Sequence, residues 1–302
     1  MSHILIHEVG PRDGLQAEAT VVPTDVKLDW IRRVAASGVD IVQVGSFVRG
    51  DKMPQMADTD ELFRILVKES PRALLSGLVL NEKGLERALD VGVPLICMGV
   101  SASETHSRKN TGMGTEDATR RIIATALEGK KAGRKVQVSV QSAFGCGFEG
   151  AIPEERVMGI VAAYLEAGLT SISLADTAGH AHPAQVRRYV QKVLELNPSA
   201  EITAHIHDTY GLGMASVYAA MEAGARAIET SFGGLGGCPF TKVAAGNVAT
   251  EDLVHGLQRT GQRLDIDLPA LIGVTKDVAR HFDRDLPGCV YKTGPIVTKV
   301  MA

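Results

Sequence analysis

The sequence lacks the features that place a protein in a membrane or in an oxidising compartment. It contains four widely spaced cysteines and no CxxC pair: Cys97, Cys146, Cys238 and Cys289. This spacing argues against a disulfide framework and against a structural zinc site, and it suits a reducing cytosol. No apolar run approaches the roughly 20 residues of a membrane-spanning helix, and the N-terminus shows neither a signal peptide nor a basic transit leader. We therefore expect a cytoplasmic protein without a membrane partner.

A surplus of either charge is also missing. The 32 Lys and Arg residues nearly balance the 35 Asp and Glu residues, and the net charge is −3. This balance gives no reason to expect nucleic acid as a partner, although a locally basic site could still bind phosphate. The chain of 302 residues is long enough for a large core and lies within the range of a single α/β barrel.

Short apolar segments alternate along the chain with amphipathic helical patterns. The predicted strands are 4–9, 40–46, 73–79, 94–100, 135–142, 170–176, 201–207 and 226–232. The predicted helices are 24–37, 58–69, 82–91, 115–132, 153–167, 182–196, 213–223 and 249–260. Eight such units predict an α/β fold, a (β/α)8 TIM barrel, rather than an open doubly wound sheet. The turn at 10–16 after the first strand is not the GxGxxG that such a sheet usually carries.

No linker or low-complexity segment interrupts this pattern, so residues 1–302 are interpreted as one domain. The barrel is expected to end near residue 260, and 261–302 would form a short extension with a helix at 268–282 and a tail. Catalytic groups of such barrels lie at the C-terminal ends of the strands. Polar residues at these positions are candidates for a site: Ser46, Ser101, Ser103, Glu104, Ser139 and Gln141.

Two histidines, His205 and His207, close the seventh predicted strand in the run 202–208. Successive side chains of a strand point to opposite faces, so these two imidazoles project the same way. Together with a carboxylate they can hold a divalent metal; the alternative is a buried, hydrogen-bonded pair. A second such spacing, His180 and His182, precedes Pro183 in a predicted loop, where we expect loop or capping roles.

Two residues from the ends of the chain could complete the metal site. Asp13 follows the first strand, and Asn247 precedes the helix predicted at 249–260. A mixed set of imidazole, carboxylate and amide oxygen fits Mg²⁺ or Mn²⁺ better than Zn²⁺. The alternatives are a solvated turn residue for Asp13 and a helix cap for Asn247.

Arg12 and Cys238 are the remaining candidates. A guanidinium beside a metal can bind a carboxylate or stabilise an enolate oxygen, although Arg12 could instead form a structural ion pair with Glu8 or Asp176. The glycine-rich segment 233–240 could cradle phosphate, and it carries Cys238, whose thiol could donate or shuttle a proton.

Several separated motifs resemble the hydroxymethylglutaryl-CoA lyase family, metal-dependent barrel enzymes related to isopropylmalate synthases. The resemblance covers the chain to about residue 260. Its motifs are GPRDGLQAE (10–18), SFV and PQMAD (46–48, 54–58), SLADTAG (173–179), HIHDTYG (205–211), GGLGGCPF (233–240) and AAGNVATEDL (244–253). The synthases are less similar, since they typically have a Thr-Leu pair before Arg-Asp-Gly and an asparagine after the second histidine, where this chain has Pro11 and Asp208.

The resemblance implies a role for each matched residue. The metal ligands would be Asp13, His205, His207 and Asn247, with Glu251 supporting Asn247. Arg12 would stabilise the enolate of the departing acetyl-CoA, Asp176 would organise the site, and Cys238 would be the loop thiol. The implied reaction is a retro-Claisen cleavage of a 3-hydroxy-3-methylglutaryl-CoA-like thioester to acetyl-CoA and a 3-keto acid, acetoacetate for the methyl compound. By analogy we also expect a homodimer.

One residue departs from the family pattern. Gln43 stands at the end of the second strand, where the family usually carries glutamate. An amide cannot take a proton or balance the charge of Arg12, so the substrate could differ from hydroxymethylglutaryl-CoA. The alternatives are a lyase for another 3-hydroxy-3-alkyl thioester, an aldolase or carboligase of the same superfamily, and a non-catalytic barrel.

Overall fold

The computed structural model describes residues 3–237 and 246–296. Within them, eight parallel strands close into a barrel in sequence order. They are β1 (Leu5–Glu8), β2 (Ile41–Ser46), β3 (Leu74–Leu78), β4 (Leu95–Ser101), β5 (Lys135–Gln141), β6 (Ser171–Ala175), β7 (Glu201–His205) and β8 (Ala227–Thr230). The predicted TIM barrel is confirmed, and each strand lies within two residues of its predicted bounds.

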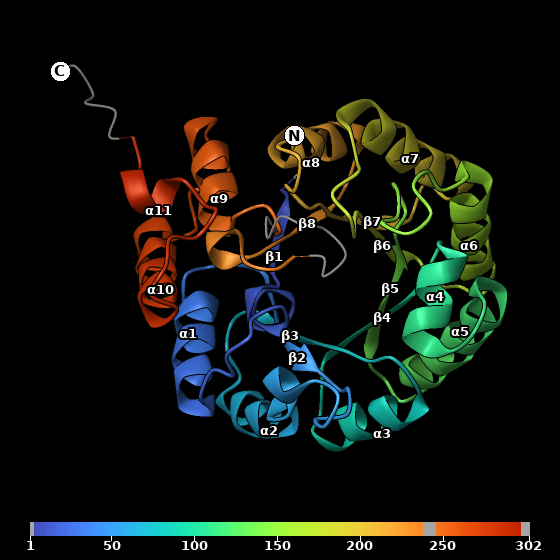
Figure 1. Cartoon of the computed structure of the whole chain (residues 1–302), viewed down its shortest axis with the longest axis horizontal. Helices are drawn as coiled ribbons and strands as arrows, with labels where there is room; N and C mark the ends of the chain where they lie inside the picture. Colours follow the sequence, from blue (N-terminus) through green and yellow to red (C-terminus); the bar gives the residue numbers. More distant parts are fainter. Residues whose placement is uncertain (1–2, 238–245, 297–302) are drawn as a thin grey trace.

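Helices form a ring outside the barrel (Figure 1). Those that the sequence predicts are α1 (Thr24–Ala36), α2 (Thr59–Glu69), α3 (Glu82–Asp90), α5 (Thr115–Lys131), α6 (Glu154–Glu166), α7 (Pro183–Leu196), α8 (Gly213–Ala223) and α9 (Thr250–Arg259). Three short elements, η1 (Gly10–Gly14), η2 (Pro54–Met56) and η3 (Phe232–Gly234), and the polar helix α4 (Glu104–Thr111) are not predicted. Helix α4 has no apolar stripe that sequence periodicity could detect.

The two faces of the barrel strands differ in character. Outward side chains such as Ile6, Ile172 and Ile202 are fully buried against the helices and belong to the main core. The interior combines a small apolar cluster of Ile41, Leu95 and Cys97 with polar side chains, two of whose hydrogen bonds each skip a strand. His7 on β1 bonds Ser76 on β3 at 2.9 Å, and the Gln137 amide on β5 donates to Thr203 on β7 at 2.9 Å.

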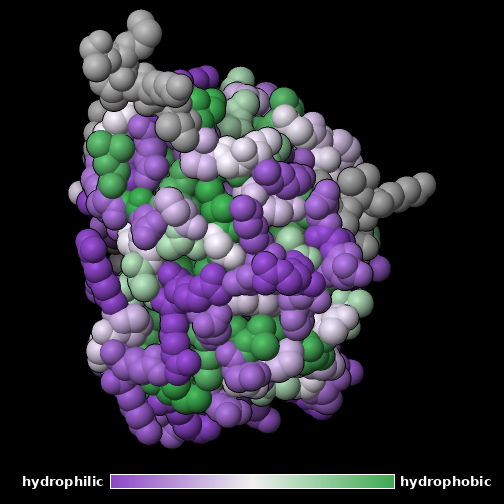
Figure 2. Space-filling model, turned by 90° about the vertical axis from the view of Figure 1, so that its left-hand side faces the viewer, coloured by the Kyte–Doolittle hydropathy of each residue, from purple (hydrophilic) through white to green (hydrophobic). Residues whose placement is uncertain are grey.

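The C-terminal extension packs beside the first and last units of the barrel. Helix α10 (Leu268–His281), predicted at 268–282, contacts α1, α9 and η3, and α11 (Val290–Thr293) contacts α9. Arg33 Nη1 of α1 lies 2.6 Å from Asp277 Oδ2 of α10. Polar side chains cover most of this side, with apolar areas between them (Figure 2). In the described residues, no helix combines the length and apolarity that a bilayer crossing requires.

Candidate active site

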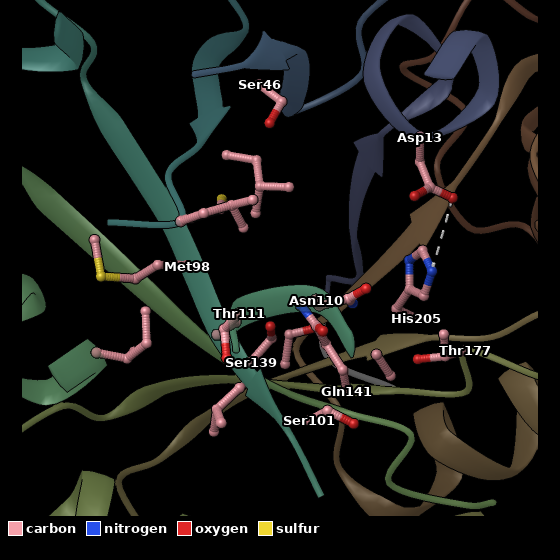
Figure 3. A pocket seen from close by; sticks show the side chains of 18 of the residues that line it. Asp13, Ser46, Met98, Ser101, Asn110, Thr111, Ser139, Gln141, Thr177 and His205 are labelled. Atoms are coloured by element: carbon pink, nitrogen blue, oxygen red, sulfur yellow. Dashed lines mark ion pairs between the residues drawn. The ribbon is translucent and has the colours of Figure 1, made fainter. Parts of the chain in front are cut away.

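Asp13, His205 and His207 converge at the C-terminal end of the barrel. Asp13 lies on η1, directly after β1, and His205 ends β7. The two histidine Nε2 atoms are 3.0 Å apart, and Asp13 Oδ2 lies 3.7 Å from His207 Nε2. Asp13 Oδ2 also lies 4.0 Å from His205 Nε2 (Figure 3). These three residues form a group whose ligand atoms could hold one metal ion.

Asn247 joins the same group from the far end of the barrel sequence. Its Nδ2 donates to Asp13 Oδ2 at 2.8 Å and to the Leu235 carbonyl at 3.0 Å. Its backbone forms an isolated bridge with His207, and its buried Oδ1 has no hydrogen-bond partner. Ala249 is the N-cap residue of α9, so Asn247 does not serve the capping role that the sequence left open.

The donor set fits a hard divalent cation. Octahedral coordination at about 2.1 Å puts neighbouring ligand atoms about 3 Å apart and opposite ones about 4.2 Å apart. The three distances among Asp13 Oδ2 and the two histidine Nε2 atoms lie within this range. The 3.0 Å between the imidazoles also suits a hydrogen bond between the rings. A bare histidine pair, however, leaves the buried Oδ1 of Asn247 without a function, whereas a cation would accept it as a ligand.

Glu229 is a site residue that the sequence analysis missed. In the strand register it lies between His205 of β7 and His7 of β1. Glu229 Oε2 is 2.8 Å from His205 Nδ1, and its Oε1 is 3.5 Å from His7 Nδ1. A carboxylate at Nδ1 fixes the tautomer that leaves Nε2 free for a metal. The sequence signal that could have identified it is a glutamate within a short apolar strand, two residues after Ala227 and therefore on the same, inward face.

Electrostatic contacts oppose the effect of burial on this group. Burial alone would lower the pKa of His205, but its hydrogen bond to Glu229 and the charge of that carboxylate raise the pKa overall. Burial would raise the pKa of Asp13, yet the Arg12 guanidinium and the two imidazoles hold it well below its usual value. Burial lowers the pKa of His7 to about 4, so this histidine is neutral at pH 7.

Arg12 lies between Asp13 and Gln43. Its Nη1 donates to Asp13 Oδ1 at 2.5 Å, and its Nε donates to Gln43 Oε1. The ion pair that the sequence allowed with Glu8 or Asp176 does not form. The structure instead pairs Arg12 with its neighbour Asp13, because η1 turns both side chains to one side.

Asp176 follows β6 but turns toward its own loop. Its carboxylate accepts from the amides of His180 at 2.8 Å and Ala181 at 3.1 Å, and burial raises its pKa. It therefore fixes the β6–α7 loop from outside the cavity. The ring of His182 accepts from the Gln185 amide at 3.4 Å and caps α7, so the second His-x-His spacing has the capping role expected of it.

The glycine-rich segment approaches the site, although Cys238 itself lies outside the described residues. A Cβ added at Gly236 would lie 2.6 Å from Asn247 Nδ2 and 3.2 Å from Asp13 Oδ2. Only a residue without a side chain fits this close approach. Glu251 was expected to support Asn247, but its Oε2 instead accepts from the Gly233 amide at 3.1 Å, at the base of this segment.

A cavity of about 560 Å³ extends from Asp13 and His205 toward α4 and α5. Its polar lining includes the predicted Ser46, Ser101, Ser139 and Gln141, together with Asn110 and Thr111 of α4 (Figure 3). Two other candidates act elsewhere. Ser103 caps α4 by accepting from the His106 amide at 3.1 Å, and Glu104 accepts from the Thr115 amide at 2.8 Å.

Known proteins are similar to this chain in sequence along almost its whole length. The HMGL-like family model matches residues 3–278. Hydroxymethylglutaryl-CoA lyase YngG of Bacillus subtilis is 34% identical, over 94% of this chain and 95% of the relative. The (R)-citramalyl-CoA lyase of Chloroflexus aurantiacus is 34% identical, over 100% and 98%. The structure of an HMG-CoA lyase from Acinetobacter baumannii in complex with coenzyme A and 3-methylmalate is 37% identical, with a TM-score of 0.91 over 98% of this chain and 96% of that one.

Proposed function

The chain belongs to the HMGL-like family and is a lyase of CoA thioesters; we propose that it cleaves a 3-hydroxy-3-methylglutaryl-CoA-like thioester to acetyl-CoA and a 3-keto acid. The observation that carries this proposal is the convergence of Asp13, His205 and His207 at one end of a cavity large enough for a thioester arm. Asn247, whose side-chain oxygen has no hydrogen-bond partner, lies beside Asp13.

The proposed reaction breaks the bond between the carbinol carbon and the carbon next to the thioester. The hydroxyl proton leaves to a base, the oxygen electron pair forms the ketone, and the bond electrons pass into the thioester enolate, which is then protonated to acetyl-CoA. A bound Mg²⁺ or Mn²⁺ would supply Lewis acidity that lowers the pKa of the substrate hydroxyl.

The chain's own residues divide the remaining work. Asp13, His205, His207 and Asn247 would hold the cation. Arg12, held between Gln43 and Asp13, is positioned to stabilise the negative charge of the enolate oxygen. Cys238, on the glycine-rich segment, would deliver the proton that completes acetyl-CoA.

Gln43 favours a second candidate substrate. It leaves Asp13 as the single carboxylate that pairs with Arg12 in the described residues, so part of the guanidinium charge is available to a substrate anion. A hydroxy acid whose carboxylate is attached to the carbinol carbon would bring such an anion close to the reacting bond. The citramalyl-CoA lyase relative and the 3-methylmalate complex concern hydroxy acids of this kind.

One assay tests both candidates. The purified protein, stripped of metal and reloaded with Mg²⁺ or Mn²⁺, is incubated with hydroxymethylglutaryl-CoA, citramalyl-CoA and malyl-type thioesters, and acetyl-CoA release is followed by chromatography. The proposal expects release that a chelator abolishes and that His207→Ala lacks. Cleavage of citramalyl-CoA alone would select the second candidate, and release from none of the thioesters would refute both.

A further inference from the structure

Glu8 is a buried carboxylate at the meeting point of three segments that carry the site. It is the last residue of β1 and has no exposed surface. Its Oε1 accepts from the amide of Gly10 at 2.7 Å and from the amide of Phe232 at 3.0 Å. Its Oε2 accepts from Thr250 Oγ1 at 2.5 Å.

Each of these partners is a few residues from a group assigned to the site. Gly10 begins η1, which carries Arg12 and Asp13. Phe232 begins η3, at the base of the glycine-rich segment, and Thr250 begins α9, three residues after Asn247. One side chain therefore connects the segment of one proposed ligand to the segment of another.

The energetics of this position require an explanation. Glu8 is paired in register with Val42 on one side and Thr230 on the other, and an apolar side chain could occupy such a position without burying a charge. The three donors to Glu8 are two main-chain amides and one hydroxyl, and burial raises its pKa to about 7. These hydrogen bonds do not fully offset the cost of burying the carboxyl group. Its presence is explained if the bonds hold the segments of the site in place.

The backbone at Gly10 packs closely against Glu8 and Phe232. A Cβ added at Gly10 would lie 2.6 Å from Glu8 Oε1 and 2.7 Å from the Phe232 ring. The three segments also have connections of their own. The Val9 amide, next to η1, donates to the Thr230 carbonyl at 2.7 Å. The Ser231 amide donates to the Val248 carbonyl and the Thr250 amide donates to the Ser231 carbonyl, each at 3.1 Å. Loss of the Glu8 bonds should therefore shift these segments without unfolding the barrel.

We propose that Glu8 is a positioning residue that sets the distance between Asp13 and Asn247, and with it the affinity of the site for its divalent cation. The inference rests on the proposed function for its link to catalysis, but its link to metal binding can be tested alone.

The test uses Mn²⁺ as the probe and three variants of the full chain. Glu8→Met keeps the length of the side chain and removes both acceptor oxygens with their three hydrogen bonds, so we expect the Kd for Mn²⁺, measured by calorimetry on metal-free protein, to rise about tenfold or more. Glu8→Gln keeps one oxygen for the two amides and should stay within about threefold of the wild type. Thr230→Val is the matched control, because the Thr230 hydroxyl is hydrogen-bonded to Thr250 at 2.8 Å and, in the described residues, not to the Glu8 carboxylate, and it should leave the Kd unchanged.

Turnover gives a second readout. Where the wild type cleaves a thioester, Glu8→Met should lower kcat about as much as it weakens Mn²⁺ binding, with a smaller change in KM, because Glu8 is not among the residues that line the cavity. A folded Glu8→Met protein that binds Mn²⁺ as tightly as the wild type would overturn the inference.

If Glu8→Met does not fold, the Kd values for Mn²⁺ of Thr250→Val and Thr230→Val are compared instead. Thr250→Val removes one of the three contacts and should raise the Kd severalfold, and equal affinities in the two variants would reject the positioning role. A wild type without lyase activity whose Glu8 variants still lose Mn²⁺ affinity would refute the proposed function and leave this inference standing.

Discussion

Replacement of Glu229 tests the metal centre through a residue that cannot itself touch the metal. Glu229→Gln removes the charge while it keeps the shape of the side chain. The carboxylate lies 2.8 Å from His205 Nδ1 and 3.5 Å from His7 Nδ1, so the amide must meet two ring nitrogens at once. If it turns its NH₂ toward His205, the ring must carry its proton on Nε2, the atom that faces His207 and Asp13.

The size of the effect follows from this geometry. Loss of a carboxylate behind a ligating histidine typically lowers metal affinity 10–100-fold, which is about 1.4–2.8 kcal/mol. We expect Glu229→Gln near the lower value, because its oxygen can still accept from His205, and Glu229→Ala near the upper value.

Calorimetric titration of metal-free protein with Mn²⁺ measures this change directly, and kcat for the cleaved thioester should fall in parallel. Ser76→Ala is the control, since Ser76 bonds the other nitrogen of His7 at 2.9 Å and does not touch His205. An affinity of Glu229→Ala within twofold of the wild type would refute the ligand role assigned to His205 Nε2.

Four further changes test separate parts of the site. His207→Ala should abolish turnover and weaken Mn²⁺ binding, and full activity would reject His207 as a ligand. Gln43→Glu should raise the rate on hydroxymethylglutaryl-CoA relative to citramalyl-CoA if Gln43 selects the substrate, and an unchanged ratio in competition assays would make this position peripheral. Cys238→Ser should lower kcat at least tenfold with Mn²⁺ affinity retained, and parallel losses of both would argue against a proton-donor role. Burial raises the pKa of Glu251 to about 8, so the folded state holds a proton that the unfolded chain loses near pH 4.5. Stability should therefore fall between about pH 5 and 8, and the wild-type Tm should drop more steeply there than that of Glu251→Gln.

The fold was predictable because its signals are local. Apolar strand segments are separated by helices that glycines follow, and these glycines adopt positive φ, for example +100° at Gly38 and +109° at Gly224. Helix α4 was not predicted, because it lacks an apolar face and depends on the Ser103 cap. Its position matters, because its side chains Asn110 and Thr111 line the same cavity as Asp13 and His205.

The site was predictable only where sequence spacing implies proximity. His205 and His207 share a face by strand geometry, and Asp13 and Asn247 were placed near them by the closed barrel and the motif resemblance. The partners of each side chain were not accessible in this way. Asp176 turned out to hold its own loop, and Glu251 the Gly233 amide, because hydrogen-bond partners depend on side-chain directions that one sequence does not specify.

Glu229 and Glu8 explain why register is the missing information. Both are glutamates in short strands, and both strands have the apolar pattern of the core. Glu229 faces the interior of the barrel, because it is in register with His205 of β7 on one side and with His7 of β1 on the other. Glu8 faces the opposite side of the sheet, where it accepts hydrogen bonds from η3 and α9. A shift of one residue in β1 or β8 would exchange these environments. The two carboxylates therefore support the same centre from inside and outside the barrel, a relationship that appears only when the eight strands are aligned.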